Sequence, residues 1–384
     1  MNGYTPMMRQ FIEIKREHED AILFFLMGDF YEMFLDDAVL ASRVLGIALT
    51  SREAGDAGKV PMCGVPYHAA DAYIAKLINS GRKVAICEQV EDPATSKGLV
   101  KREVVRIITP ATHHDATPDS LNYIVSWHGT GHEVALAAVE FLTGVVECMY
   151  FSGRDPYHDL VDELGRIHPR EAAMDDLSRR DDVIAVLDRM GTLITEVETC
   201  GTAEAVSYLQ SVGLDFCGQD VAKVAVAQAL KYLENLGSGG FGHFTKPRLV
   251  ERGSEMVLDA ITRRNLELTR SMQGGEREGS LLGVLDHTMT PMGARMIRRV
   301  IEQPLLSASA IRRRHAAVAE LNADMLTRSE LRDALDELYD LERLSARVAT
   351  GSASPRDLKS LGTSFTATGR LMHIMSSYSC DLLM

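Results

Sequence analysis

The chain has 384 residues, 46% of them hydrophobic and 25% charged, which is enough apolar material for two or three domains with buried cores. This composition excludes a disordered or collagen-like chain. The sequence contains no run of about 18 apolar residues, which a membrane helix would need. The N-terminus lacks the apolar segment of a secretory signal, and the six cysteines form no C-x-x-C pair, so the sequence predicts a cytoplasmic protein with reduced thiols.

The formal net charge of −13 argues against a nucleic-acid-binding protein until its distribution is considered. Residues 110–239 contain 8 basic and 21 acidic side chains, which accounts for the whole imbalance. Residues 240–315 contain 13 basic and 8 acidic side chains, whereas residues 1–109 are close to neutral. A polyanion can therefore contact either of these two segments without facing the acidic block.

The first predicted segment alternates strands and helices. The apolar run 22–27 predicts a buried strand, which Gly28 and Asp29 interrupt. Apolar residues at steps of three and four from Tyr31 to Leu45 then predict an amphipathic helix. A glycine-rich loop at 53–59, a helix at 71–79 and strands at 83–90 and 104–109 complete an α/β domain, which we assign to residues 1–112.

Two further domains are predicted after a linker-like stretch at 111–120. A second α/β domain over residues 120–240 is expected from strands at 122–128 and 133–151 and from helices at 160–169, 180–190 and 221–236. A glycine-rich stretch at 237–243 follows it. Beyond that stretch the pattern is almost wholly helical, so we predict an all-α domain over residues 250–384.

No motif in the sequence supports a catalytic, cofactor or metal site. There is no G-x-x-x-x-G-K-[ST] segment, so no P-loop for a nucleotide is expected. His128 and His132 enclose Gly-Thr-Gly, which favours a turn over a helical metal pair. Glu140 and Glu147 suggest a carboxylate nuclease site of the ribonuclease-H type, but we interpret them as exposed strand residues. No Ser or Cys has a base or a nucleophile elbow beside it.

The segment 27–34, MGDFYEMF, allows two interpretations. In the structural one, Asp29 caps a helix N-terminus and Glu32 completes a pair like a capping box. In the functional one, Phe30 lies off the apolar stripe, and its ring is a wedge that enters between base steps from the minor groove of DNA. The Glu32 carboxylate then hydrogen-bonds the edge of the displaced base, which a mispaired step releases at a lower cost than a paired one.

The sequence resembles the N-terminal half of the MutS family of bacterial DNA mismatch-recognition proteins. The matching stretches run in the family's order from residue 5 to beyond residue 305, and they are TPMMRQF, MGDFYEMFLDDA, ALTSR, PMCGVPYHA, VAICEQVEDPATSKG, REVVRIITPAT, MVLDAITRRNLELT and LLGVLDHTMTPMGARMIRRVIEQPL. The resemblance implies a mixed α/β mismatch-recognition domain at 1–112, a ribonuclease-H-like α/β connector at 120–240, and a helical lever or core domain at 250–384.

The resemblance also implies a DNA-binding site in the first domain. The family's Phe-x-Glu motif falls on Phe30, which stacks on the mispaired base, and on Glu32, which hydrogen-bonds it. Met27 matches a position that contacts DNA near the kink. Arg52 and Arg102 match basic positions that lie against the DNA backbone in the family. Lys97 and Lys101 can add phosphate contacts. For the two lysines, plain solvated side chains are the alternative.

The implied partners are mismatched double-stranded DNA, a MutL-like protein that binds the connector, and a second copy of the chain as in the family. The family's clamp and its ATPase, which uses ATP and Mg²⁺, are expected to be absent from this chain. The chain then resembles a fragment with no catalytic site, cofactor or metal of its own, for which ATP hydrolysis and stable dimerisation are in question. The implied location is the bacterial cytoplasm, at the nucleoid during repair, with no membrane contact.

Two other functions stay open. The chain can be a scaffold that binds repair partners through the acidic connector without reading mismatches, or a nuclease that uses the connector glutamates. The intact Phe-x-Glu motif argues against the scaffold.

Four arginines of the third domain lie on apolar helix stripes, and they are Arg263, Arg264, Arg298 and Arg299. We interpret them as members of structural or interdomain ion pairs in preference to DNA contacts.

Overall fold

The computed structural model describes residues 3–91, 100–113, 121–237, 240–250, 253 and 255–383. Its contacts divide the chain into two compact units. The first comprises Met1–Asp115 with Tyr232–Ser238, and the second comprises Ala116–Lys231 with Gly239–Met384. Each unit combines helices with a mixed sheet, which confirms the predicted mixed α/β class. The division into three domains stays a prediction.

The described part of the first unit contains a six-stranded sheet in the order β3-β4-β2-β1-β5-β6. Strands β1 and β5 run parallel, and the other neighbouring pairs are antiparallel. The strands are β1 (Ala21–Met27), β2 (Phe30–Phe34), β3 (Thr50–Glu53), β4 (Lys59–Pro66), β5 (Lys83–Gln89) and β6 (Arg102–Ile108). The helices are α1 (Pro6–Glu17), α2 (Leu35–Leu45), the 3-10 turn η1 (Tyr67–Ala69) and α3 (Ala70–Asn79).

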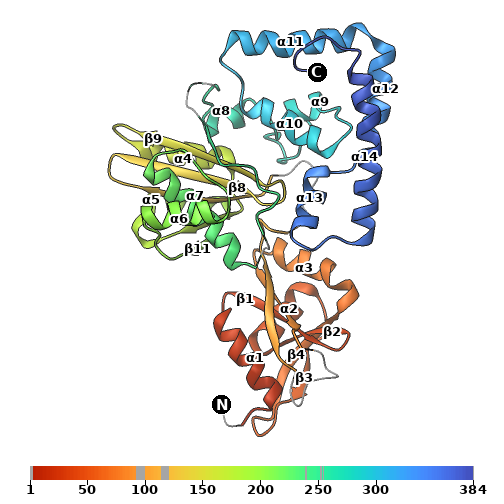
Figure 1. The fold of residues 1–384 in the computed structure, drawn as a ribbon. Coiled ribbons are helices and arrows are strands. Elements are labelled where there is room, and N and C mark those ends of the chain that lie inside the picture. The colour runs from red at the N-terminus through yellow and green to blue at the C-terminus, as the bar shows by residue number, and fades with distance from the viewer. Residues whose placement is uncertain are drawn as a thin grey trace. The chain divides into compact units, whose positions relative to one another are not determined.

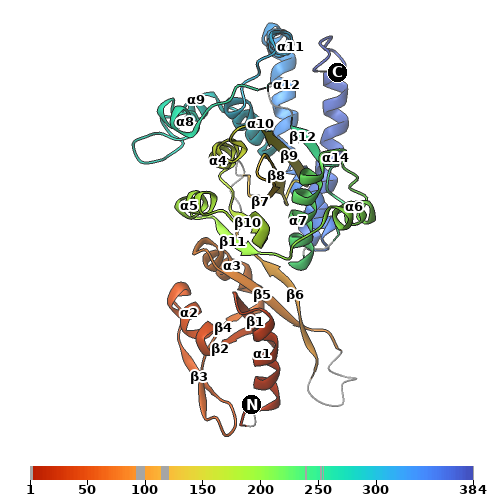
Figure 2. The same ribbon diagram turned by 90° about the vertical axis from the view of Figure 1, so that its left-hand side faces the viewer.

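Helices cover both faces of this sheet (Figure 1 and Figure 2). On one face, Phe11 of α1 packs edge-on against Phe25 and Phe34, with ring centroids 5.6 and 5.0 Å apart. On the other face, α2 and α3 cover the alternate residues of β2, Tyr31 and Met33. Strand β1 is central and buried on both faces, which explains why its sequence is an unbroken apolar run.

The helix predicted from Tyr31 begins only at Leu35, because the preceding residues form β2. Tyr31 and Met33 alternate into the core, and this period of two was hidden within the helical spacing of the longer segment. Gly28 and Asp29 form the two-residue turn between β1 and β2, and Gly28 has φ of 61°. The prediction that Asp29 caps a helix is therefore wrong. The hairpin of β3 and β4 and the helix α1 had no predicted counterpart.

The second unit contains, in its described residues, a sheet in the order β11-β10-β7-β8-β9-β12. Strands β7 to β9 form an antiparallel meander, with β10 and β11 added in parallel beyond β7 and β12 in parallel beyond β9. The strands are β7 (Tyr123–Gly129), β8 (Glu133–Glu140), β9 (Val145–Ser152), β10 (Glu171–Met174), β11 (Leu193–Glu196) and β12 (Arg248–Val250). The helices up to residue 235 are α4 (Pro156–Ile167), η2 (Asp176–Ser178), α5 (Asp181–Met190), α6 (Thr202–Ser211) and α7 (Asp220–Asn235).

Helices also cover both faces of the second sheet. Trp127 of β7 is fully buried in the cluster formed with α4 and α5, and its Nε1 donates to Ser178 O at 2.9 Å. The preceding residue, Ser126, points to the opposite face of the sheet and donates to Gln228 Oε1 of α7 at 3.1 Å. These alternating contacts account for the mainly apolar sequences of the central strands.

The segment after β12 is mainly helical, as predicted. Its helices are α8 (Ala260–Asn265), α9 (Leu281–Leu285), α10 (Pro291–Glu302), α11 (Ala308–Ala323), α12 (Met325–Asp336), α13 (Leu341–Ala349) and α14 (Pro355–Met375). Helices α12 and α14 lie side by side (Figure 1). Within the ranges that the structure describes, every helix is too short or too polar to cross a membrane.

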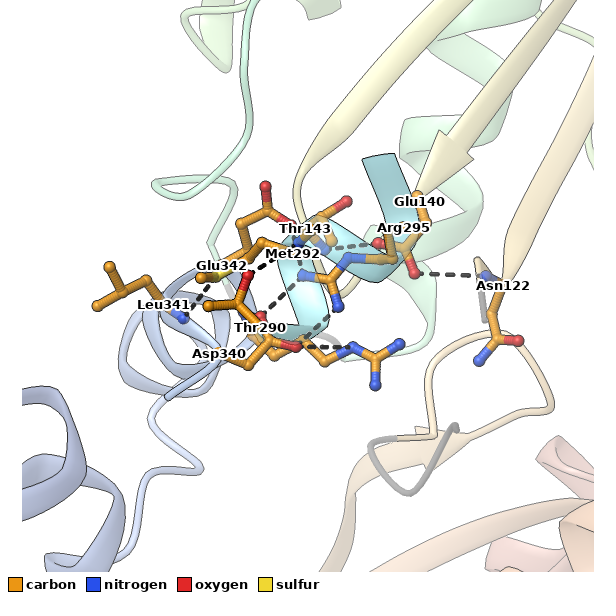
Figure 3. A network of polar contacts seen from close by, with 11 residues as sticks. Asn122, Glu140, Thr143, Thr290, Met292, Arg295, Asp340, Leu341 and Glu342 are labelled. Carbon is orange, nitrogen blue, oxygen red and sulfur yellow. Dashed lines mark hydrogen bonds and ion pairs between the residues drawn. The ribbon is translucent and has the colours of Figure 1, made fainter. Parts of the chain in front are cut away.

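An ion network centred on the buried Arg295 ties α10 to the start of α13 (Figure 3). The Arg295 guanidinium donates to both carboxylate oxygens of Asp340 at 2.7 and 2.8 Å, and to Glu342 at 2.5 Å. Asp340 is also the N-cap of α13, because its side chain accepts from Arg343 N. One carboxylate therefore caps a helix and neutralises a buried arginine at the same time.

Candidate nucleic-acid interface

The turn between β1 and β2 presents Phe30 to solvent. Phe30 pairs with Met27 across the turn and with Pro66 of β4 on its other side. Met27 packs partly into the apolar cluster beneath α1, whereas Phe30 remains 46% exposed. The ring of Phe30 is therefore held at the first residue of an interior strand of a sheet, and not at the start of a helix as predicted.

The alternation along β2 explains why Phe30 is exposed. Side chains 30, 32 and 34 point to the face that α1 covers, and their burial increases along the strand. Phe34 is fully buried against Phe11, Glu32 is half-buried, and Phe30 is exposed. The strand is thus anchored at its far end by an aromatic core contact, which gives the exposed ring a rigid base.

The opposite face of β2 is anchored as well. Tyr31 lies in the core cluster beneath α2 and α3, and its hydroxyl donates to Glu88 Oε1 of β5 at 3.1 Å. Burial and the neighbouring Glu88 carboxylate raise the pKa of Tyr31 above its usual value, so the phenol stays protonated and can donate. Residues on both sides of Phe30 and Glu32 are therefore fixed in position.

A second aromatic residue, Tyr67, lies beside the turn and was not predicted as a site residue. Its backbone N–H donates to Asp29 O at 2.8 Å, its ring centroid is 5.5 Å from that of Tyr31, and the residue is 53% exposed. Only the stretch PMCGVPYHA, which contains it, signalled this region in the sequence. Gly64 of β4 adjoins this group, because a Cβ added to it would lie 3.3 Å from Tyr31 O and in ordinary van der Waals contact with Glu32 Cγ and Phe30 Cδ1, at 3.7 and 3.8 Å.

Glu32 and Arg52 form an ion pair beside Phe30. Arg52 Nη1 of β3 donates to Glu32 Oε2, and the two side chains are 37% and 18% exposed. Among the described residues no hydrogen bond to Glu32 Oε1 is made, so this oxygen can accept one. The structure brings together three of the predicted site residues, Phe30, Glu32 and Arg52, with Met27 at the base of the group.

The other predicted cations do not join this group. Arg102 is only 7% exposed, and its guanidinium donates to Leu26 O at 3.0 Å and to Gln10 Oε1 at 3.2 Å. We therefore correct the expectation that Arg102 faces a DNA backbone, since its position is a structural one inside the first unit. Lys101 is exposed and paired with Glu103, whose hydrogen bond raises the pKa of the lysine. Lys97 lies outside the described residues.

Glu140 and Glu147 of the second sheet are buried, so the expectation of exposed strand residues is wrong. The Glu140 side chain accepts from the backbone N–H groups of Asn122 at 3.4 Å and Thr143 at 2.6 Å (Figure 3). Glu147 accepts from Arg248 at 2.7 Å and from Arg299. Both carboxylates are thus satisfied by protein donors, and no set of metal-binding side chains occurs among the residues searched, which are those the structure describes.

Two of the four arginines interpreted as structural make the expected ion pairs. Arg299 is paired with Glu147, and Arg298 with Glu302 at 3.3 Å. Arg263 and Arg264 have no carboxylate partner within the described part of the chain. For these two residues the predicted ion pairs are not found.

Comparison with known proteins identifies the family. The family model for MutS domain I matches residues 5–117, and that for MutS domain III matches residues 261–383. Among relatives named DNA mismatch repair protein MutS, the one from Desulforamulus reducens is 44% identical, and the match covers 93% of this chain and 42% of the relative. Those from Symbiobacterium thermophilum and Alkaliphilus oremlandii are 43% and 42% identical, over 94% and 100% of this chain and 43% and 45% of the relatives.

The chain spans less than half the length of these curated relatives. The two family models lie in the family's order and together match well over half of the residues. The domain I match contains the turn with Phe30, Glu32 and Arg52. The chain belongs to the MutS family.

Proposed function

We propose that the chain recognises mispaired or unpaired bases in double-stranded DNA and thereby serves DNA mismatch repair. The observation that carries this proposal is the exposed Phe30 ring, held by a rigid sheet next to the half-buried Glu32 carboxylate. An exposed aromatic side chain costs hydrophobic free energy in a solitary protein, and a base stack offers it a partner of matching shape. The MutS names of the relatives support the same function.

The mechanism follows from the cost of deforming DNA. Phe30 enters between two base steps from the minor groove and kinks the duplex, which requires unstacking at the point of entry. A paired and stacked step resists by a few kcal/mol, and a mispaired step resists less. Because the strand bearing Phe30 is fixed on both faces, the wedge does not yield, and the difference in DNA deformability becomes a difference in affinity.

Glu32 reads the displaced base in this proposal. Its Oε1 accepts a hydrogen bond from a base N–H, while Oε2 remains held by Arg52 Nη1. Arg52 thus orients Glu32 and offsets its repulsion of the phosphates. The remaining guanidinium N–H groups of Arg52 are available to a phosphate, and the exposed Lys101 adds a non-specific contact.

The wider assignments rest on family membership. We propose that the second unit contains a ribonuclease-H-like connector that receives a MutL-like partner, and that recognition is signalled to an ATPase using ATP and Mg²⁺ in the rest of the family's length. Homodimerisation and a cytoplasmic, nucleoid-associated location belong to the same proposal. None of these steps requires a catalytic residue from the part of the chain described here.

The test compares the affinity of the chain for matched duplex and for duplexes with one G·T pair or one unpaired T, measured by fluorescence anisotropy at a fixed salt concentration. Phe30→Ala should reduce the mismatch preference by about 1–3 kcal/mol, the usual contribution of one stacking contact. Val105→Ala is the matched control. Val105 lies on the edge strand β6, and its exposed fraction of 43% is similar to the 46% of Phe30. An unchanged preference in Phe30→Ala would show that the wedge is assigned wrongly. Binding of a MutL-like partner without any mismatch preference in the wild type would favour the scaffold.

A further inference from the structure

The second unit contains a cleft of about 750 Å³ that the proposed DNA contacts do not use. Its walls come from the end of α4 and the turn after it, from α8 and the loop after it, and from α10. Helices α4 and α8 are neighbours in Figure 2. The volume falls within the range of about 300–1,000 Å³ that is usual for small-molecule sites. We call it the arginine cleft, because seven arginines line it against one carboxylate, Glu302, among the described residues.

Three of these arginines are neutralised by nearby carboxylates. They are half-buried and make the ion pairs Arg166–Glu163, Arg298–Glu302 and Arg299–Glu147. Such pairs fix the geometry of the wall and leave little net charge there. They are therefore the supporting structure of the cleft and not its source of positive potential.

The other four arginines have no carboxylate partner in the described part of the chain. Arg170, Arg264 and Arg270 are exposed, and Arg263 is half-buried with its Nη1 lacking any hydrogen-bond partner among the described residues. Burial, followed by the positive charges of Arg270 and Arg170, lowers the pKa of His168, which also lines the cleft. The lowered pKa agrees with a positive potential in the cleft.

We propose that the arginine cleft binds a short linear polyphosphate, either free or as the phosphate chain of a nucleotide. Guanidinium groups present a planar fork of N–H donors that matches phosphate oxygens, and four forks without a carboxylate partner suit a chain of two or three phosphates, although Arg263 already donates one N–H to Asp162 O at 3.5 Å. A single phosphate would leave some of these cations unpaired. The cleft has one half-buried aromatic residue, Tyr123, and no stacked pair of aromatic rings among its described lining, so the phosphate chain is the part that is recognised.

The experiment titrates the whole chain with inorganic tripolyphosphate by isothermal calorimetry at constant ionic strength. One ligand should bind per chain. The double variant Arg264→Gln/Arg270→Gln should weaken binding at least about tenfold, because it removes two charge-assisted contacts. Its folding should be unaffected, since both side chains are exposed and unpaired among the described residues.

The matched control is Arg312→Gln/Arg313→Gln on α11. It changes the net charge by the same amount at exposed arginines outside the cleft. An equal loss of affinity in both double variants, or no measurable binding to the wild type, would overturn the proposal.

Two further arms identify the source of the phosphate chain. A nucleoside triphosphate that binds more tightly than tripolyphosphate assigns the site to nucleotides, and equal or weaker binding assigns it to free polyphosphate. Inorganic phosphate should bind more weakly than both. Tighter binding of a polyglutamate peptide than of tripolyphosphate would overturn the assignment to phosphate. Duplex DNA that competes fully with tripolyphosphate in Phe30→Ala would show a backbone contact instead.

Discussion

Replacing Glu32 with glutamine removes the carboxylate that holds Arg52 while it preserves the size of the side chain. The pair joins β2 to β3 on the surface of the first sheet, with side-chain exposures of 18% and 37%. Ion pairs with this access to water contribute about 0–1 kcal/mol to stability. We therefore expect the free energy of unfolding of Glu32→Gln to lie within about 1 kcal/mol of the wild type.

The larger expected effect is on DNA binding. In the wild type the Glu32–Arg52 pair has no net charge, and in the variant Arg52 becomes an uncompensated cation beside the wedge. Because the charge of Arg52 is then no longer offset by Glu32, about one further phosphate is neutralised on binding, which steepens the dependence of log affinity on log salt by about 0.9, a factor of about 3.5 between about 50 and 200 mM salt. Glu32→Gln should therefore bind matched duplex more tightly at low salt, and its mismatch preference should fall because a neutral amide oxygen is a weaker acceptor than the carboxylate.

The assay is fluorescence anisotropy with matched and G·T duplexes over a salt series. Glu53→Gln is the control, because Glu53 is a carboxylate on the same strand as Arg52 and is paired only loosely with Lys59 at 3.9 Å. The double variant Glu32→Gln/Arg52→Gln should return the salt slope to that of the wild type. An unchanged slope in Glu32→Gln, or an equal rise in Glu53→Gln, would refute the reasoning.

Three further outcomes are expected. Gly64→Ala should keep the fold but lower the mismatch preference, measured with the same duplexes, because its Cβ would lie 3.3 Å from a backbone oxygen and within 3.8 Å of Phe30. Lys15→Met should destabilise the first unit by about 3 kcal/mol in urea unfolding, because it removes the cation that lies 2.9 Å from the buried Asp37 carboxylate. Burial already raises the pKa of Asp37, so the charged form is disfavoured by folding, and the loss should be larger at pH 7 than at about pH 4. His168 should titrate below its usual pKa in NMR spectra, and added tripolyphosphate should raise this value.

The sequence predicted the strands better than the junction at the candidate site. The buried strand β1 is an unbroken apolar run, and β5 has a shorter apolar run, residues 84–87, at its centre. At 30–45 the apolar residues fit both a helix and a strand followed by a helix, and periodicity cannot separate the two. The segment begins as a strand because the two-residue turn at Gly28 and Asp29 pairs Phe30 with Met27 of β1.

The candidate site was predicted through family resemblance more than through chemistry. Phe30 and Glu32 lie together as the motif implies, but no spacing rule indicates that Arg52, on another strand, reaches Glu32. Tyr67 was missed for the same reason, since it approaches Asp29 only through pairing of β2 with β4. Arg102 matched a basic position in the sequence, and only the structure reveals that its charge faces inward onto backbone carbonyl groups.

The distribution of charge becomes intelligible once the ion pairs are known. The acidic block at 110–239 and the basic stretch at 240–315 partly neutralise each other, as in the pair of Glu147 with Arg299 and Arg248. Although burial opposes ionisation of Glu147, the two arginines hold its pKa below the usual value, so this pairing loses its stabilising effect only in acid. Arginines that pair in this way serve the fold. Four arginines without a carboxylate partner among the described residues, Arg264 and Arg270 included, line one cleft, where a bound anion would relieve their mutual repulsion.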